Sequence, residues 1–265
     1  MIKLCLAGAA GHVGRELTRA ISGSPDLVLV SAVGRSHVGE SLKDIGGGPR
    51  ADVRLHASVA EALQAGPAEV FIDYTRPEAV KANVRVAIEA GCDAVIGTSG
   101  LTDADYAEID AWAERKGVGV FAAGNFSITA ALMQHFSAVM ARHMPHWEIL
   151  DYASDAKPDA PSGTARELAM QLSRVAKPTW KVPVDETQGL KESRGATLNG
   201  SQMHSIRVPG YYSAIQAVFG DAGERIELRH ESTSYAPYVA GTLLATRKVS
   251  GFKGLKRGMA TLLQL

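Results

Sequence analysis

Short apolar runs and amphipathic segments take turns through the first half of the chain. Apolar runs predict strands at residues 2–6, 27–33, 70–73, 94–97 and 118–123. Helical periodicity predicts helices at residues 13–22, 58–64, 78–90 and 103–116. Because strands and helices alternate at short spacing, the pattern predicts an α/β fold with a parallel sheet covered on both faces.

The pattern changes near residue 125. A long helix is expected at residues 128–143, with a core-facing stripe of Leu132, Phe136, Val139 and Met140. Strand-like runs follow at residues 147–152, 202–208, 214–219 and 225–230, and they predict a mostly antiparallel sheet. The final segments, 238–247 and 254–265, are predicted to be helical and to pack back on the first domain. We therefore expect a first domain of residues 1–125, completed by 237–265, and an inserted α+β domain of residues 126–236.

Composition narrows the class of partner. The chain has 265 residues and is 46% hydrophobic, enough to bury a large core. Lys plus Arg and Asp plus Glu both number 28, so no overall field recruits nucleic acid or a membrane surface. Cys5 and Cys92 form no disulfide framework, no apolar run is long enough to span a bilayer, and no metal-ligand spacing occurs. A cytoplasmic protein with a small-molecule partner and no metal is expected.

A glycine turn joins the first strand to the first helix. Gly8, Gly11 and Gly14 follow the spacing G-x-x-G-x-x-G. In this position glycines permit a tight turn and close approach of the backbone to a pyrophosphate, although a purely structural turn is the alternative. The turn predicts a Rossmann-type, doubly wound domain that binds a dinucleotide.

The end of the second strand bears on the choice of cofactor. An NAD site usually has an acidic residue here for the ribose 2'-hydroxyl, but the chain reads Val33-Gly34-Arg35. Arg35 suits a 2'-phosphate, which favours NADPH over NADH; an ordinary exposed loop arginine is the alternative. Three further loops, at residues 73–78, 97–100 and 123–126, follow predicted strands and are expected to line one edge of the sheet, where ligands bind.

Residues 157–164, Lys-Pro-Asp-Ala-Pro-Ser-Gly-Thr, indicate an anion site. A helix is expected at about residues 165–174, with Thr164 and Glu167 at capping-box spacing and N–H groups available at its start. A carboxylate would dock there, with Lys157 close by to add a charge or a proton. A capped surface helix after a proline-rich turn is the alternative reading.

Together these motifs resemble the 4-hydroxy-tetrahydrodipicolinate reductase family over nearly the whole chain. The matching segments are 8–14, 72–78, 97–100, 125–127, 157–165 and 204–207. The resemblance implies a Rossmann domain plus a four-stranded domain for substrate binding and oligomerisation. It also implies a homotetramer and reduction of a cyclic imine dicarboxylate by NADPH or NADH.

The resemblance and the glycine turn also imply site residues. The cofactor set is Gly8, Gly11, His12, Val13, Gly14, Arg35, Gly97, Thr98, Ser99, Ala123, Gly124, Asn125 and Phe126. The substrate set is Ser154, Gly163 and Thr164, with Lys157 in catalysis.

One segment departs from the family. The family carries two adjacent histidines just upstream of the lysine, and often a third, where this chain has Ala153, Ser154 and Ala156. Three explanations follow. The chain reduces another small imino carboxylate, with a proton from Lys157, Asp155, Tyr152 or water; or it is a genuine lysine-pathway reductase with a substitute donor; or it is a catalytically silent NADP-binding sensor or assembly protein.

Overall fold

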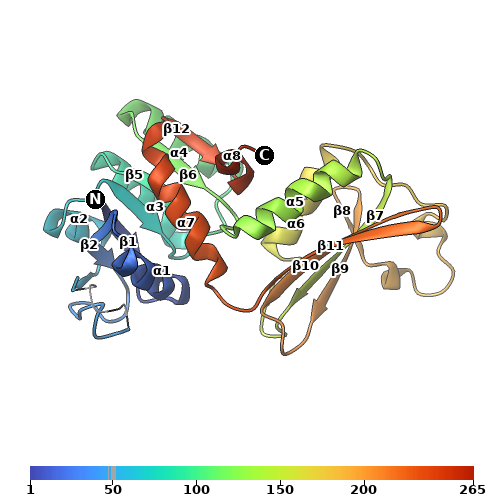
Figure 1. The fold of residues 1–265 in the computed structure, drawn as a ribbon, viewed down its shortest axis with the longest axis horizontal. Helices are drawn as coiled ribbons and strands as arrows, with labels where there is room; N and C mark the ends of the chain where they lie inside the picture. The colour runs from blue at the N-terminus through green and yellow to red at the C-terminus, as the bar shows by residue number, and fades with distance from the viewer. Residues whose placement is uncertain (47, 49–51) are drawn as a thin grey trace. The chain divides into compact units, whose positions relative to one another are not determined.

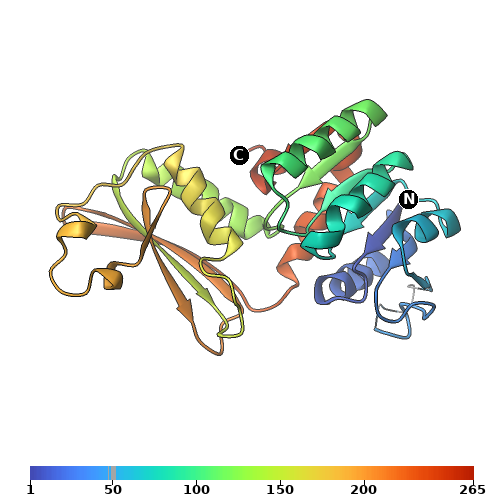
Figure 2. The same ribbon diagram turned by 180° about the vertical axis from the view of Figure 1, so that it is seen from behind.

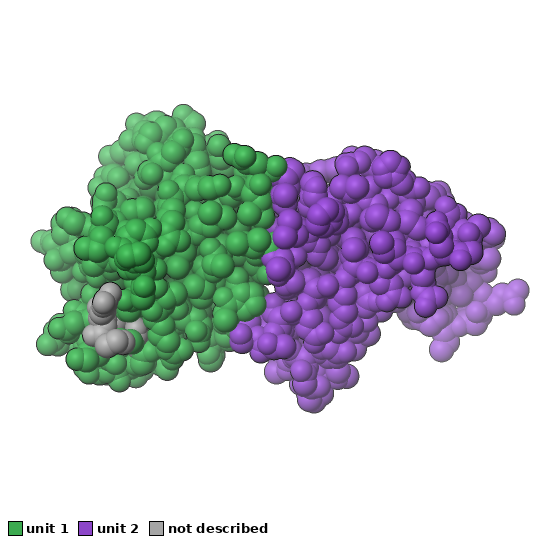
Figure 3. Space-filling view, viewed as in Figure 1, with its two compact units in different colours: residues 1–128, 235–264 green, residues 129–234, 265 purple. Residues whose placement is uncertain are grey.

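The structure is a computed structural model that describes residues 1–46, 48 and 52–265. The chain divides into two compact units (Figure 3). The first consists of Met1–Ile128 and Tyr235–Gln264, and the second of Thr129–Ser234 with Leu265. The first unit is therefore discontinuous in sequence, and each unit is described by itself below.

A parallel sheet forms the centre of the first unit. In the part of the chain that the structure describes, it has seven strands in the order β12-β6-β5-β4-β1-β2-β3, and each neighbouring pair is parallel. The strands are β1 Ile2–Ala7, β2 Leu27–Val33, β3 Leu55–His56, β4 Val70–Asp73, β5 Asp93–Ile96, β6 Gly119–Ala122 and β12 Gly254–Arg257. Because all strands run the same way, the loops after β1, β4, β5 and β6 lie along one edge.

Helices cover both faces of this sheet. They are α1 His12–Gly23, α2 Val59–Ala65, α3 Pro77–Glu89, α4 Asp103–Lys116, α7 Pro237–Lys248 and α8 Met259–Leu263, with a 3-10 turn, η3, at Val249–Gly251. Figures 1 and 2 show α1 and α7 on one face and α2, α3 and α4 on the other. Apolar residues of α2, α3 and α4 pack on the sheet around the fully buried Phe71. The predicted Rossmann-type fold is confirmed.

The second unit is a mixed sheet with two helices on one face. Its strands, in the order β11-β10-β7-β9-β8, are β7 His146–Ala153, β8 Ala196–Leu198, β9 Ser201–Arg207, β10 Ser213–Asp221 and β11 Glu224–Ser232. Helices α5 Ile128–Ala141 and α6 Gly163–Ser173 pack on it around Trp147 and Phe219. Short 3-10 turns, η1 Val184–Glu186 and η2 Lys191–Arg194, precede β8. Within this fully described range β7–β9 is the one parallel pair, so the prediction of a mostly antiparallel sheet is confirmed.

The structure corrects several expectations about the elements. The sheet of the second unit has five strands, where the resemblance implied four. Residues 254–265 do not form one helix: Gly254–Arg257 is a strand that pairs with β6, and helix α8 begins at Met259. Residues 254–257 are extended because they pair with the otherwise open edge of β6, and backbone pairing in a sheet outweighs a weak local helix propensity.

No described helix is long and apolar enough to cross a membrane.

The buried face of α5 also differs from the predicted stripe. Phe136 is 52% exposed, and Leu132, Val139 and Met140 are half-buried. The buried residues are instead Ala130, Ala131, Met133, Gln134, Ser137 and Ala141. Four of these six residues are Ala or Ser, and the Ser137 hydroxyl is satisfied by donating to Met133 O at 2.8 Å.

Candidate functional site

Two glycines of the turn after β1 leave no room for a side chain. Gly8 has φ +82°, and a Cβ there would lie 2.2 Å from Tyr74 O. A Cβ on Gly14 would lie 2.2 Å from Gly8 O. Both positions therefore require glycine, Gly8 for its positive φ and both for the close approach of α1 and the β4 loop to the turn.

The start of α1 suits an anionic ligand. Its N-cap is Gly11, which has no side chain to accept a hydrogen bond from the N–H groups of the first turn, and that turn contains no acidic residue. The first N–H groups of a helix have no acceptor within the helix, and the helix dipole makes this end positive. A pyrophosphate fits such a terminus, so the residues present are compatible with a dinucleotide.

A cavity of about 270 Å³ opens beside this helix start. Its walls are Gly11, His12, Val13, Gly14, Tyr74, Thr75, Pro77, Gly97, Thr98, Ser99 and Tyr235. It brings together seven residues of the predicted cofactor set, from the loops after β1 and β5. Tyr74, Thr75, Pro77 and Tyr235 were not in that set.

A fully buried carboxylate, Asp73, ties two of the cavity's loops together. Its Oδ1 accepts hydrogen bonds from Thr75 N at 2.9 Å, Thr75 Oγ1 at 2.7 Å and Thr98 Oγ1 at 2.7 Å. Its Oδ2 accepts one from Asn83 Nδ2 at 3.0 Å. Because a buried charge is tolerated when it is hydrogen-bonded in this way, Asp73 can fix the loops after β4 and β5 relative to each other.

The other predicted cofactor residues lie outside the cavity walls. Gly8 is half-buried in the turn, and Arg35 is exposed two residues after the end of β2. After β6, Ala123 and Phe126 are buried, and Phe126 packs edge-on against Phe121 at 5.8 Å between ring centroids. Gly124 is exposed, while Asn125 is half-buried and its Oδ1 accepts from Ser127 N at 2.8 Å.

A second group of polar residues surrounds Lys157 in the second unit. Lys157 Nζ forms an ion pair with Asp159 Oδ1 at 2.7 Å, with the two side chains 36% and 41% exposed. Partial burial acts to raise the pKa of Asp159, but the hydrogen bond and charge of Lys157 outweigh it and hold that pKa below its usual range. The ammonium group thus has a carboxylate partner and still reaches solvent.

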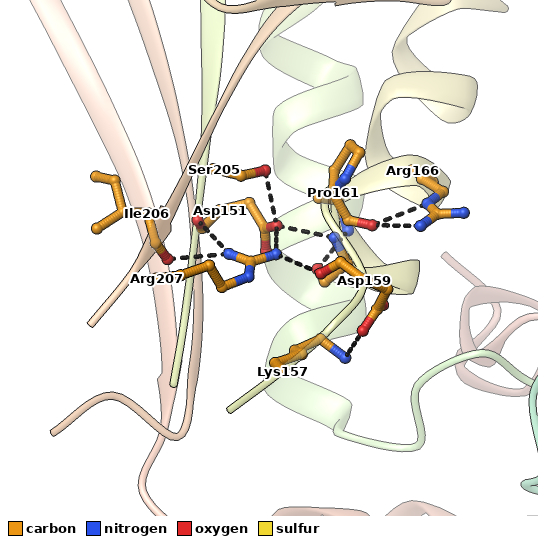
Figure 4. A network of polar contacts seen from close by, with 10 residues as sticks. Asp151, Lys157, Asp159, Pro161, Arg166, Ser205, Ile206 and Arg207 are labelled. Atoms are coloured by element: carbon orange, nitrogen blue, oxygen red, sulfur yellow. Dashed lines mark hydrogen bonds and ion pairs between the residues drawn. The ribbon is translucent and has the colours of Figure 1, made fainter. Parts of the chain in front are cut away.

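Arg207 and Asp151 anchor the loop that carries this pair (Figure 4). Arg207 Nη2 donates to Asp151 Oδ2 at 2.7 Å and to Asp159 O at 2.9 Å. Asp151 Oδ2 also accepts from Ser162 N at 2.8 Å and from Ser205 Oγ at 3.3 Å. Both ends of the segment 159–162 are therefore attached to the β7–β9 pair.

The start of α6 differs from its prediction. The helix begins at Gly163 and is capped by Ser162, whose Oγ accepts from Ala165 N at 3.3 Å, so the expected cap at Thr164 is wrong. Ser162 N is held by Asp151, which places the Ser162 side chain at the capping position. A Cβ on Gly163 would meet no described atom within 4 Å, so the helix tip is open to a ligand.

Residues 153, 154 and 156 bring no titratable group to the loop. Ala153 is buried, Ala156 is exposed, and Ser154 Oγ donates to Asp155 Oδ1 at 3.2 Å. Tyr152 belongs to the opposite face of β7 from Asp151, because side chains alternate along a strand, and its hydroxyl donates to Gln216 Oε1 at 3.1 Å. Of the side chains considered as proton donors, Lys157 and Asp155 remain on the loop.

Comparisons with known proteins cover both units. The family model for the N-terminus of dihydrodipicolinate reductase matches residues 2–126, and the model for its C-terminus matches residues 127–263.

Similar proteins extend over the full chain. The 4-hydroxy-tetrahydrodipicolinate reductase of Moorella thermoacetica is 38% identical over 264 residues, which covers 99% of this chain and 98% of the relative. That of Halalkalibacterium halodurans is 34% identical and covers 100% of both chains. A solved structure of dipicolinate-bound dihydrodipicolinate reductase from Paenisporosarcina sp. TG-14 has a TM-score of 0.83 and 29% identity, and covers 98% of this chain and 99% of that one.

Proposed function

Because the chain belongs to the dihydrodipicolinate reductase family, we propose that it reduces 4-hydroxy-tetrahydrodipicolinate in lysine biosynthesis. It is an NAD(P)H-dependent oxidoreductase with an N-terminal nucleotide-binding domain. The observation that carries the proposal is the end-to-end match to relatives of this name. This match favours the second of the three explanations, a lysine-pathway reductase, over the first, a reductase of a different imine.

The first unit would bind the cofactor, and bound NADPH would supply a hydride. The start of α1 is suited to the pyrophosphate, and the loop of Gly97, Thr98 and Ser99 provides another wall of the same cavity. Arg35 would pair with a 2'-phosphate, which makes NADPH the preferred cofactor. Ala123 to Phe126, at the same edge of the sheet, would contribute backbone groups.

The second unit would bind the substrate. The N–H groups at the Gly163–Thr164 helix tip would hold one carboxylate, and the Ser154 hydroxyl would add a hydrogen bond. On this substrate the 4-hydroxyl group leaves as water, which gives a dihydrodipicolinate whose C=C bond is conjugated with C=N. The hydride then forms a C–H bond at C4, the electron pair moves through the conjugated system toward nitrogen, and a proton adds to the carbon beside C4. In our proposal Lys157 gives that proton, and water later restores it.

Asp159 has a supporting role in this scheme. Its carboxylate, 2.7 Å from Lys157 Nζ, favours the charged ammonium form before the reaction and limits where the flexible lysine side chain can point. With alanine at 153 and 156, no imidazole shares this task, so we expect the rate to depend strongly on Lys157.

Cofactor oxidation with freshly generated 4-hydroxy-tetrahydrodipicolinate tests the function. We expect turnover, and a fall in kcat of at least about 100-fold in Lys157→Ala, the scale of general acid catalysis. Lys157→Arg is the matched control, since it keeps the charge but does not release a proton near neutral pH. It should also lose kcat, while the Kd for NADPH stays unchanged in both variants.

Other outcomes would select another explanation. Full activity in Lys157→Arg would mean that charge alone is needed. Reduction of a different cyclic imine, with the lysine-pathway compound inert, would identify the altered-substrate reductase. Tight NADPH binding without oxidation of any imine in a broad panel would identify a silent binding protein.

We also propose the larger organisation of the protein. Residues 1–125 with 237–265 would form the dinucleotide domain, and residues 126–236 the domain for substrate binding and assembly. The sheet face opposite α5 and α6 would join copies of the chain into a homotetramer, which light scattering of the purified protein can measure. A cytoplasmic location fits Cys5 and Cys92, which are both buried free thiols.

A further inference from the structure

We propose that Tyr235, a residue of the C-terminal segment, belongs to the dinucleotide site and positions His12 over the start of α1. This inference rests on the proposed assignment of the cavity to the cofactor. It concerns a part of the chain that lies far from the glycine turn in sequence and outside the predicted cofactor set.

The two rings form a parallel stack. The centroids of His12 and Tyr235 lie 5.0 Å apart, and the planes differ by 2°. At this separation the rings are offset, an arrangement that aromatic pairs favour. Both residues line the cavity, and His12 is the first residue of α1. The stack therefore forms one wall of the space in front of the helix start.

Tyr235 is held in place by the segment that follows it. Helix α7 begins two residues later and docks on the first unit, where Thr242 Oγ1 and Tyr74 Oη are 2.6 Å apart. A Cβ on Gly241 would lie 1.9 Å from Phe126 O, so this helix lies directly against the backbone of the β6 loop. Because α7 is fixed in this way, the ring of Tyr235 is placed before any ligand arrives.

The position of the stack indicates its chemistry. An imidazole at the first position of α1 can donate a ring N–H to an oxygen of the dinucleotide's diphosphate, beside the backbone N–H groups of the helix. An isolated histidine side chain at this exposed position would sample several rotamers and lose that freedom on binding. Tyr235 removes part of this cost by confining His12, so it acts as a positioning residue.

Fluorescence titration with NADPH, without substrate, tests the inference. We expect Tyr235→Ala to raise the Kd roughly three- to ten-fold, the scale of an aromatic pair. Tyr235→Phe, which keeps the ring, should retain most of the affinity. In the His12→Ala background, Tyr235→Ala should have little further effect, because the tyrosine then has nothing to position. Tyr211→Ala, from the Tyr152–Tyr211 ring pair of the second unit, is the matched control and should not change the Kd.

Two results would overturn the inference. One is an unchanged Kd in Tyr235→Ala, and the other is full additivity of the His12 and Tyr235 substitutions. Val13→Asp tests the cavity assignment separately: an acid in the first turn stabilises a helix but repels a phosphate, whereas Val13→Asn adds no charge. If Val13→Asp binds NADPH normally, the cavity is not the cofactor site and the inference fails with it. If Val13→Asp loses binding while Tyr235→Ala does not, the inference fails alone.

Discussion

Arg207 and Asp151 form an ion pair that is largely shielded from solvent. Nη2 and Oδ2 are 2.7 Å apart, and the side chains are 15% and 1% exposed. Arg207→Ala would leave a buried carboxylate without its cation, so we expect a loss of about 3 kcal/mol in the free energy of unfolding. Urea unfolding measures this, and Arg225→Ala, at an exposed ion pair on β11, should have almost no effect.

The same ion pair also predicts an effect of Arg207→Lys on catalysis. Lysine keeps the charge but lacks the planar guanidinium, whose Nη2 donates to Asp151 Oδ2 and Asp159 O while Nη1 donates to Asp151 O, so the Lys157 loop should loosen. We expect kcat to fall and KM for the imine to rise, with the Kd for NADPH unchanged. A variant with wild-type KM and kcat would contradict a positioning role for the pair.

Ser162→Ala and Thr164→Ala distinguish the two possible caps of α6. Because Ser162 Oγ accepts from Ala165 N, Ser162→Ala should cost about 1 kcal/mol of stability. Thr164→Ala removes no cap and introduces a better helix former, so its cost in stability should be smaller than that of Ser162→Ala. Denaturant midpoints of the two variants, measured side by side, give the comparison; the reverse order would place the cap at Thr164.

Tyr74→Phe should weaken the attachment of α7. The substitution removes the hydroxyl that pairs with Thr242 and should cost about 1 kcal/mol at neutral pH. Burial raises the pKa of the Tyr74 phenol above its usual value of about 10, although the bond to Thr242 acts to lower it. The folded protein therefore keeps this proton when the unfolded chain has lost it, and the contribution of Tyr74 to stability declines as the pH rises above about 10.

The stability difference between wild type and Tyr74→Phe should accordingly narrow above about pH 10, since the variant has no phenol at this position. Unfolding free energies at a series of pH values check the sign. A difference that grew with pH would mean that Tyr74 ionises more easily in the folded protein than in the unfolded chain.

Arg35→Asp tests the choice of cofactor. A carboxylate at the end of β2 suits a ribose 2'-hydroxyl and repels a 2'-phosphate, so the ratio of NADPH to NADH affinity should fall by about ten-fold or more. Arg115→Ala, at an exposed position in the last turn of α4, should leave the ratio unchanged. An unaltered ratio of affinities in Arg35→Asp would mean that Arg35 makes no contact with the cofactor.

Local patterns were enough to predict the elements of the parallel sheet. Strands at 27–33 and 70–73 and the helix at 103–116 have the predicted bounds, because apolar runs and helical periodicity mark them directly. The predicted face of α5 was wrong because large apolar side chains were given the most weight, whereas four of the six buried residues are Ala or Ser. The strand at Gly254–Arg257 was missed because its partner, β6, lies more than a hundred residues away.

The same limit applies to the sites. The glycine turn and the Lys157 loop are each one contiguous segment, so the glycines and Lys157 could be proposed from spacing, whereas His12, Val13 and Ser154 were implied by the family resemblance. The stack of Tyr235 on His12 joins residues more than two hundred positions apart, and Arg207 reaches Asp151 across 56 residues. No local periodicity encodes such pairs, because they arise from sheet order and helix docking.

The discontinuous first unit also affects how the protein is made. Synthesis runs from the N-terminus, so a nascent chain lacks β12, and the β6 edge has no neighbour there, until the last stretch leaves the ribosome. Thr129–Ser234 has emerged completely by then and can collapse first. Nucleotide binding should therefore appear late in translation, and ribosome-stalled chains that end before Tyr235 should not retain NADPH.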